Sequence, residues 1–174
     1  MTCKTLEGSP FAHIPQIEGE SIDCCVTMIP IWGVEAVTMQ KYIEGLKLVF
    51  RMCKRVLKKN GQLWVNVGQS WGVRIQFIRA LEKDKWHLRA HIAASEKSLD
   101  QFGSIIMFTK NIKRSKDISS IPDCMSLASI SAMYQYCIKA GCPKGGTVLD
   151  PFAGGGITGQ IANSLGRHSI LIVQ

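Results

Sequence analysis

The sequence lacks any apolar run long enough to span a bilayer, and no secretory signal pattern precedes its first cysteine. Internal repeats and low-complexity tracts are absent as well. We therefore expect a globular protein that makes no membrane contact, is cytoplasmic or nucleoid-associated, and is not secreted.

The seven cysteines lack the paired spacing of a zinc site. Cys24 and Cys25 are adjacent, and Cys137 and Cys142 are five positions apart; neither spacing is a zinc pattern. Histidines offer no alternative, because His87 and His91 fall on an expected strand where a four-residue gap spans roughly 13 Å. We expect no metal, and we interpret the cysteines as reduced core residues of a cytosolic protein.

Acidic residues are scarce relative to basic ones. The chain of 174 residues has 13 Asp and Glu against 21 Lys and Arg, which gives a net charge of +8. This balance favours an anionic partner, with nucleic acid ahead of a membrane. The alternative is a basic protein whose charges serve only solubility. The length fits one domain.

What the sequence does contain is an alternation of strand and helix patterns. It predicts an α/β fold with a mostly parallel sheet and helices on both faces. The run 21–29 is continuously apolar, as in a strand covered on both sides. The clearest helix is 39–59, with an apolar stripe, a Thr38 cap and a stop at Asn60-Gly61. Its basic face either binds phosphates or is solvated.

Two segments show neither the two-residue period of a strand nor the 3.6-residue period of a helix. We expect residues 1–20 to form an irregular arm and residues 111–123 to form a loop. The remaining strands are expected at 62–68, 86–93, 104–110, 147–150 and 168–174, and the remaining helices at 73–83, at 126–140 and after the glycine-rich turn that follows residue 150.

That glycine-rich turn is the most specific stretch: residues 145–159 read GGTVLDPFAGGGITG. Glycines let a backbone approach a ligand closely, and a helix N-terminus offers free N–H groups beyond the carboxyl end of a strand. Gly154, Gly156 and Gly159 also satisfy G-x-G-x-x-G. We do not expect a dinucleotide domain to start here, because that fingerprint needs an acidic residue and a continuing fold about 20 positions later.

Residues 140–159, AGCPKGGTVLDPFAGGGITG, closely resemble the S-adenosyl-L-methionine (SAM) motif of the DNA amino-methyltransferases, which methylate N4 of cytosine or N6 of adenine. The family's wording is A-G-x-P-x-G-G-x-V-L-D-P-F-x-G-x-G-T-T-G, and Ile157 replaces its first threonine. The segments 17–27, 42–71 and 102–111 are similar to the strand before the catalytic loop, to the helix, strand and turn after it, and to a strand ending in Phe-Thr-Lys.

The resemblance covers roughly residues 17–173. It implies a circularly permuted, Rossmann-like SAM-dependent methyltransferase fold in which the catalytic half precedes the cofactor half. It further implies a single domain over 1–174, with a catalytic half at 17–110, a cofactor half at 124–174 and no separate target-recognition domain. SAM would be the cofactor and DNA the substrate, with a place in DNA methylation and restriction-modification.

The resemblance also implies site residues. The loop 110–118 is the candidate for contact with DNA phosphates without sequence readout, although it can equally be a solvated surface loop. Trp64, Trp71 and Trp86 are interpreted as core or cofactor-pocket packing. The implied cofactor-binding residues are Asp150, Pro151, Phe152, Gly154, Gly156 and Val173; the DNA-binding candidates are Lys110, Lys113, Arg114 and Lys116.

The catalytic loop departs from the family's pattern of Ser, Asp or Asn followed by Pro-Pro and Tyr or Phe. A side-chain oxygen and a proline carbonyl of that loop accept hydrogens from the exocyclic amino group, and the aromatic ring stacks on the flipped base. Here the loop has Met28, Ile29, Pro30 and Ile31, followed by Trp32 as a stacking candidate. A thioether is a weak acceptor, and isoleucine has no ring.

Two more positions depart from the family. Gln69 replaces an aspartate in the turn, and Val173, with Gln174 beside it, replaces the glutamate that holds the ribose hydroxyls. Together with the loop substitutions, these departures indicate a degenerate catalytic set, which consists of Met28, Pro30, Ile31 and Trp32.

We therefore expect a SAM-dependent methyltransferase-family protein with impaired catalysis and with weakened or lost cofactor binding. One alternative is an inactive pseudo-methyltransferase that serves as a DNA-binding or partner-binding subunit, its partner an active methyltransferase or a second copy. Another is a basic nucleic-acid-binding module without a ligand.

Overall fold

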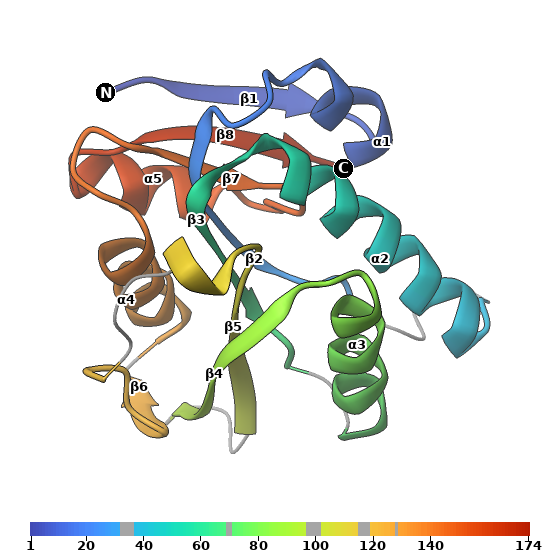
Figure 1. The fold of residues 1–174 in the computed structure, drawn as a ribbon. Helices are drawn as coiled ribbons and strands as arrows, with labels where there is room; N and C mark the ends of the chain where they lie inside the picture. Colours follow the sequence, from blue (N-terminus) through green and yellow to red (C-terminus); the bar gives the residue numbers. More distant parts are fainter. Residues whose placement is uncertain (32–36, 69–70, 97–101, 115–118, 128) are drawn as a thin grey trace.

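The computed structural model describes residues 1–31, 37–68, 71–96, 102–114, 119–127 and 129–174. These residues form one sheet with the strand order β1-β8-β7-β2-β3-β5-β4-β6. Neighbouring strands are parallel except on both sides of β5. The prediction of an α/β fold with a mostly parallel sheet and helices on both faces is confirmed (Figure 1).

The elements follow one another closely along the chain. The strands are β1 Cys3–Glu7, β2 Ile22–Met28, β3 Leu57–Asn66, β4 His87–Glu96, β5 Phe102–Thr109, β6 Cys124–Leu127, β7 Thr147–Asp150 and β8 His168–Val173. The helices are α1 Pro10–His13, α2 Met39–Val56, α3 Trp71–Lys83, α4 Ile130–Gly141 and α5 Ile157–Ser164, with short 3-10 turns at Ile14–Gln16 and Ile112–Arg114.

Alternation along the central strands divides the core into two layers. Cys25, Leu63 and Leu149 face a cluster built with α2 and α3. Trp64 and Val148 face the opposite cluster, built with α4 and α5. The central strands are covered on both sides, which explains why the run at 21–29 does not alternate between apolar and polar residues (Figure 1).

The helix expected at 39–59 ends three residues earlier than predicted, at Val56. Thr38 does cap its start, with its hydroxyl accepting the Lys41 N–H at 3.3 Å. Leu57 is already extended and pairs with Ile22, so β3 begins there. The Asn60-Gly61 pair, interpreted as a helix stop, instead lies inside β3, near the point where the pairing with β2 shifts register.

Residues 1–20 are not an irregular arm, so that prediction was wrong. The segment contributes β1, which adds to the sheet beside β8, and α1 with a 3-10 turn after it. The Gly8 N–H donates to the Val173 carbonyl at 2.8 Å. Arg55 of α2 donates to the carbonyls of Ile14, Pro15 and Ile17 and thereby fastens the segment to the body.

The loop expected at 111–123 contains a 3-10 turn at Ile112–Arg114. A short strand, β6, follows it and pairs with β4, a strand that the sequence analysis did not predict. The next helix begins at Ile130 rather than 126, because Ser129 caps it by accepting the Ala132 N–H at 3.2 Å.

All seven cysteines are free, and five are buried, but Cys3 and Cys124 are exposed and correct the expectation of a uniformly buried set. Among the described residues, no group of three or more His, Cys, Asp and Glu side chains is placed to hold a metal ion. No helix in the described part of the chain has the length and apolar character needed to cross a membrane.

Two glycines give opposite predictions for the same substitution. A Cβ at Gly141 would lie 2.5 Å from Cys24 Sγ and 2.6 Å from Trp64 Nε1, so Gly141→Ala is expected to lower the free energy of unfolding by about 1–3 kcal/mol. A Cβ at Gly45, inside α2, meets nothing within 4 Å. Gly45→Ala is therefore expected to raise that free energy by about 0.5–1 kcal/mol. Urea unfolding measures both; changes of equal sign would contradict the packing described above.

Candidate functional site

The carboxyl ends of β8, β7, β2 and β3 meet at one edge of the sheet, because these strands are adjacent and parallel. Pairing of Cys25 with Leu149 puts the ends of β2 and β7 side by side. The Thr27 hydroxyl donates to Asp150 Oδ1 at 2.5 Å and so joins the two strand ends directly. The segment before the expected catalytic loop and the start of the expected cofactor loop therefore lie together.

Asp150 is fully buried, and both of its carboxyl oxygens are engaged. Besides Thr27, the donors are the Thr158 hydroxyl and the Phe152 N–H, the latter at 3.1 Å. Burial raises the pKa of Asp150 to about 6, and its hydrogen bonds oppose the rise. The carboxyl group thus ties β2, β7 and α5 to one another.

Tyr134 of α4 closes this cluster from the helix side. It is 5% exposed, and burial raises the pKa of its hydroxyl, as does the charge of Asp150. Hydrogen bonds to the Thr158 side chain and the Met28 backbone oppose that rise. Through Tyr134, the helix before the glycine turn contacts both halves of the candidate site.

The glycine turn after β7 is held by its backbone. The Ala153 N–H donates to the Ile172 carbonyl at 3.0 Å, and the Gly156 N–H donates to the Ala153 carbonyl at 2.8 Å. Gly154 and Gly156 have φ of +47° and +77°, a conformation that favours glycine. A Cβ at Gly154 or Gly155 would meet nothing within 4 Å, so open space lies along this turn just before α5 begins.

The other expected cofactor residues lie in different surroundings. Pro151 is buried. The Phe152 ring packs edge-on against Phe50 of α2, with the ring centroids 6.2 Å apart. Val173 is half-buried at the end of β8. Gly159, which belongs to the G-x-G-x-x-G pattern, lies inside α5, where a Cβ would come within 2.7 Å of Leu171 Cδ1 and 2.9 Å of Cys3 Sγ.

The loop after β2 presents side chains that accept hydrogen bonds poorly. Met28 is 37% exposed, and the Asn66 amide nitrogen lies 3.6 Å from its sulfur. Ile31 is 71% exposed. The Pro30 carbonyl accepts a hydrogen bond from the Tyr42 hydroxyl at 2.6 Å, and burial raises the pKa of Tyr42 to about 12. Trp32 lies outside the described residues, as does Gln69.

Sequence reasoning missed Thr27, Tyr42 and Asn66 as members of this edge. Tyr42 falls on the apolar stripe of the helix expected at 39–59, and nothing in that pattern indicates that its hydroxyl reaches the Pro30 carbonyl. Trp71 was expected to pack in the core or in the cofactor pocket; Trp64 and Trp86 are buried in the core, whereas Trp71 is 64% exposed, with the Arg74 guanidinium 5.6 Å from its ring centroid.

The candidate DNA-binding residues differ in whether their charged groups are already engaged by contacts within the protein. The Lys110 ammonium donates to the carbonyls of Leu57 and Lys54 and lies 3.6 Å from a Glu20 oxygen, so it neutralises the end of α2. Lys113 is exposed. The side chain of Arg114 and the whole of Lys116 lie outside the described part of the chain.

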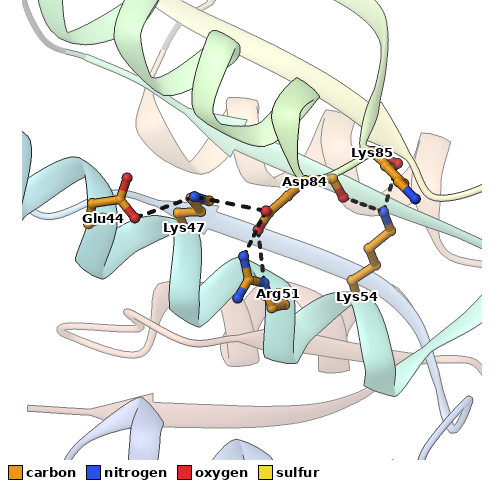
Figure 2. Close-up of polar contacts among 6 residues, drawn as sticks. All are labelled: Glu44, Lys47, Arg51, Lys54, Asp84 and Lys85. Carbon is orange, nitrogen blue, oxygen red and sulfur yellow. Dashed lines mark hydrogen bonds and ion pairs between the residues drawn. The ribbon is translucent and has the colours of Figure 1, made fainter.

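The basic face of α2 packs against the turn after α3 (Figure 2). Arg51 makes two hydrogen bonds to the Asp84 carboxylate, at 3.0 and 2.8 Å, and Lys47 lies 4.0 Å from it. Lys54 donates to the carbonyls of Asp84 and Lys85. Burial lowers the pKa of Lys54. This part of the basic face therefore holds α2 against the turn after α3, whereas the sequence led us to expect either phosphate binding or solvation.

Comparisons with known proteins find relatives of the segment that holds the glycine turn and of the chain as a whole. A family model for N6 and N4 methyltransferases, described as DNA methylase, matches residues 131–173, which run from α4 to the end of β8. The type II methyltransferase M.SmaI of Serratia marcescens is 24% identical over 249 residues, covering 97% of this chain and 85% of that protein. The type II methyltransferase M.XycI of Xanthomonas campestris pv. cyanopsidis is 21% identical and is covered over 81% of its length.

Solved structures share the fold. The PvuII DNA methyltransferase, described as cytosine-N4-specific, superposes with a TM-score of 0.87 at 16% identity, covering 100% of this chain and 82% of that one. The M1.HpyAVI–SAM complex superposes with a TM-score of 0.74 at 16% identity, covering 99% and 93%.

The chain is similar to DNA amino-methyltransferases, through the family model at its carboxyl-terminal segment and through these relatives over nearly its whole length. The superpositions confirm the expected SAM-dependent methyltransferase fold, in which the loop after β2 precedes the glycine turn after β7 along the chain. The M.SmaI match spans 249 positions whereas this chain has 174 residues, a difference of 75, so the relative has at least that many positions without a counterpart here.

Proposed function

We propose that this DNA amino-methyltransferase-family protein binds SAM and acts on the N4 amino group of cytosine or the N6 amino group of adenine in DNA, with impaired catalysis. The observation that carries the proposal is the Thr27–Asp150 hydrogen bond at 2.5 Å. It fixes the end of β2 beside the glycine turn, so a nucleobase and a methyl donor bound at the two strand ends would meet at one edge of the sheet.

The glycine turn fits the adenosylmethionine. Gly154 and Gly155 leave open space where a side chain would project, and Gly156 begins α5 with its N-terminal N–H groups. When bound, SAM supplies an electrophilic methyl group. Asp150 would hold the turn rather than touch the ligand, because its oxygens are already engaged. Val173 offers no acceptor to the ribose, which supports weakened binding.

The loop after β2 supports impaired catalysis. Transfer to an exocyclic nitrogen needs acceptors for the amino hydrogens, and Met28 offers only a thioether. The Pro30 carbonyl already accepts the Tyr42 hydroxyl, and Ile31 has no ring to stack on a flipped base. Trp32 is the proposed stacking residue. Losing one preorganised hydrogen bond to a transition state costs roughly 10²–10³ in rate.

The occupied Pro30 carbonyl also favours the second candidate, an inactive pseudo-methyltransferase that serves as a subunit. We infer a single domain without a target-recognition domain, which the positions present only in M.SmaI support. Sequence readout would then come from a partner, either an active methyltransferase or a second copy. Lys113, Arg114 and Lys116 are the proposed phosphate contacts, and an action on DNA would place the protein in the cytoplasm or nucleoid.

Two measurements test the proposal. Calorimetric titration with SAM is expected to show binding, and labelled SAM with mixed duplex and single-stranded DNA is expected to show slow incorporation above background. Binding without incorporation would support the inactive subunit. Absence of both binding and a thermal shift would contradict the cofactor site and leave a nucleic-acid-binding module.

A further inference from the structure

The end of β1 brings a carboxylate to the cofactor edge. β1 runs parallel to β8 at the border of the sheet, with Leu6 opposite Ile172 and Glu7 opposite Val173 (Figure 1). The segment holding β1 was expected to be irregular, so Glu7 was not considered from the sequence. Its backbone is fixed, because its carbonyl lies 2.8 Å from His13 Nε2 and the next N–H, that of Gly8, donates to Val173.

The face on which Glu7 lies follows from its neighbours. Leu6 and Ile172 pack in the cluster on the α2 side of the sheet. Leu171 and Cys3 lie on the other side, since both contact the position that a Cβ at Gly159 would occupy. Side chains alternate along a strand, so Glu7 and Val173 share the face of Leu171, toward the glycine turn.

An adenosine bound at a glycine turn needs an acceptor for its ribose hydroxyls. In sheets of this kind that acceptor is an Asp or Glu about 20 residues later, at the end of the next strand. Here that strand is β8, and it ends at Val173. Asp150 cannot serve, because it is buried and its oxygens are engaged. Glu7 is exposed, and no ion pair among the described residues involves it.

We propose that Glu7 accepts hydrogen bonds from the ribose hydroxyls of SAM, replacing from β1 the acceptor that β8 lacks. Neighbouring strands lie about 4.8 Å apart, which the longer Glu side chain can span to reach the space beside Val173. The inference rests on the proposed cofactor site and names a residue that determines its affinity.

Calorimetric titration of the full chain with SAM and with S-adenosylhomocysteine tests the role. Glu7→Gln is expected to weaken both ligands about tenfold, since the two share the ribose and a charge-assisted hydrogen bond is lost. Glu18→Gln, at another exposed carboxylate, is the matched control and is expected to bind as the unaltered chain does. Val173→Glu added to Glu7→Gln is expected to restore affinity, because it returns a carboxylate to the same face.

The outcomes separate the two proposals. Equal affinities of the unaltered chain and Glu7→Gln would overturn the role of Glu7 and leave the cofactor site standing. Weakening of SAM alone would also overturn it, because the carboxylate would then act on the sulfonium charge. If the unaltered chain binds neither ligand, the proposed function fails and this inference fails with it. The thermal midpoint of Glu7→Gln is expected to stay unchanged, which separates ligand binding from folding.

Discussion

Methyl transfer to DNA is expected to rise about a hundredfold when Met28→Asn is combined with Ile31→Tyr. Asparagine supplies an uncharged oxygen acceptor at the end of β2, and tyrosine supplies a ring for a flipped base. Met28 is 37% exposed and Ile31 is 71% exposed, so both positions accept new polar side chains without burying them. Asparagine is preferred to aspartate because a second carboxylate near Asp150 would repel it.

Incorporation of labelled methyl groups at saturating SAM measures this gain, and Met28→Leu with Ile31→Tyr is the matched control. The control restores the ring without an acceptor and is expected to gain much less. Adding Tyr42→Phe to the rebuilt loop removes the hydrogen bond that the Pro30 carbonyl accepts from this hydroxyl, and it is expected to raise the rate further. If the rebuilt protein binds SAM and DNA yet shows no gain, the loop after β2 is not where the amino group reacts.

The sequence predicted most elements whose patterns are local. The continuous apolar run of β2, the amphipathic α2 and the glycine turn after β7 each carry their signal within a few residues. β1 was missed because Pro10, Pro15 and several polar residues indicate an irregular segment, and because its pairing partner, β8, lies at the other end of the chain. A border strand gains its hydrogen bonds from a remote segment, which no local pattern reveals.

The candidate site was predicted in its position but not in its contacts. Resemblance brought the glycine turn and the Pro30 loop together, and the fold joins them as expected. The resemblance did not indicate that the carboxylate of Asp150 would accept hydrogen bonds from the hydroxyls of Thr27 and Thr158. Nor did the sequence indicate that the Lys110 ammonium would donate hydrogen bonds to carbonyls at the end of α2. Each of these contacts joins residues that are far apart in the sequence.

Asp150→Ala is expected to lower the free energy of unfolding by about 3 kcal/mol or more. The carboxyl group accepts from Thr27, from Thr158 and from the Phe152 N–H in a fully buried cluster. Removing it leaves these donors without their acceptor, and a buried unsatisfied polar group costs about 1–3 kcal/mol. Loss of SAM binding is expected to accompany it, because the glycine turn begins at this residue. Urea unfolding and calorimetry measure the two effects.

Asp150→Asn separates the charge of this group from its shape. Because the folded protein raises the pKa of Asp150 from 3.8 to about 6, the folded state holds the proton more tightly than the unfolded state. The resulting stabilisation is complete below pH 3.8 and is lost as the pH rises through 6. Relative to Asp150→Asn, the unaltered chain is therefore expected to lose about 2 kcal/mol of unfolding free energy between pH 4 and pH 7. Asp123→Asn, at an exposed carboxylate, is the matched control. Parallel profiles of the unaltered chain and Asp150→Asn would mean that the pKa of Asp150 is the same in the folded and unfolded states, and that its three donors offset its burial.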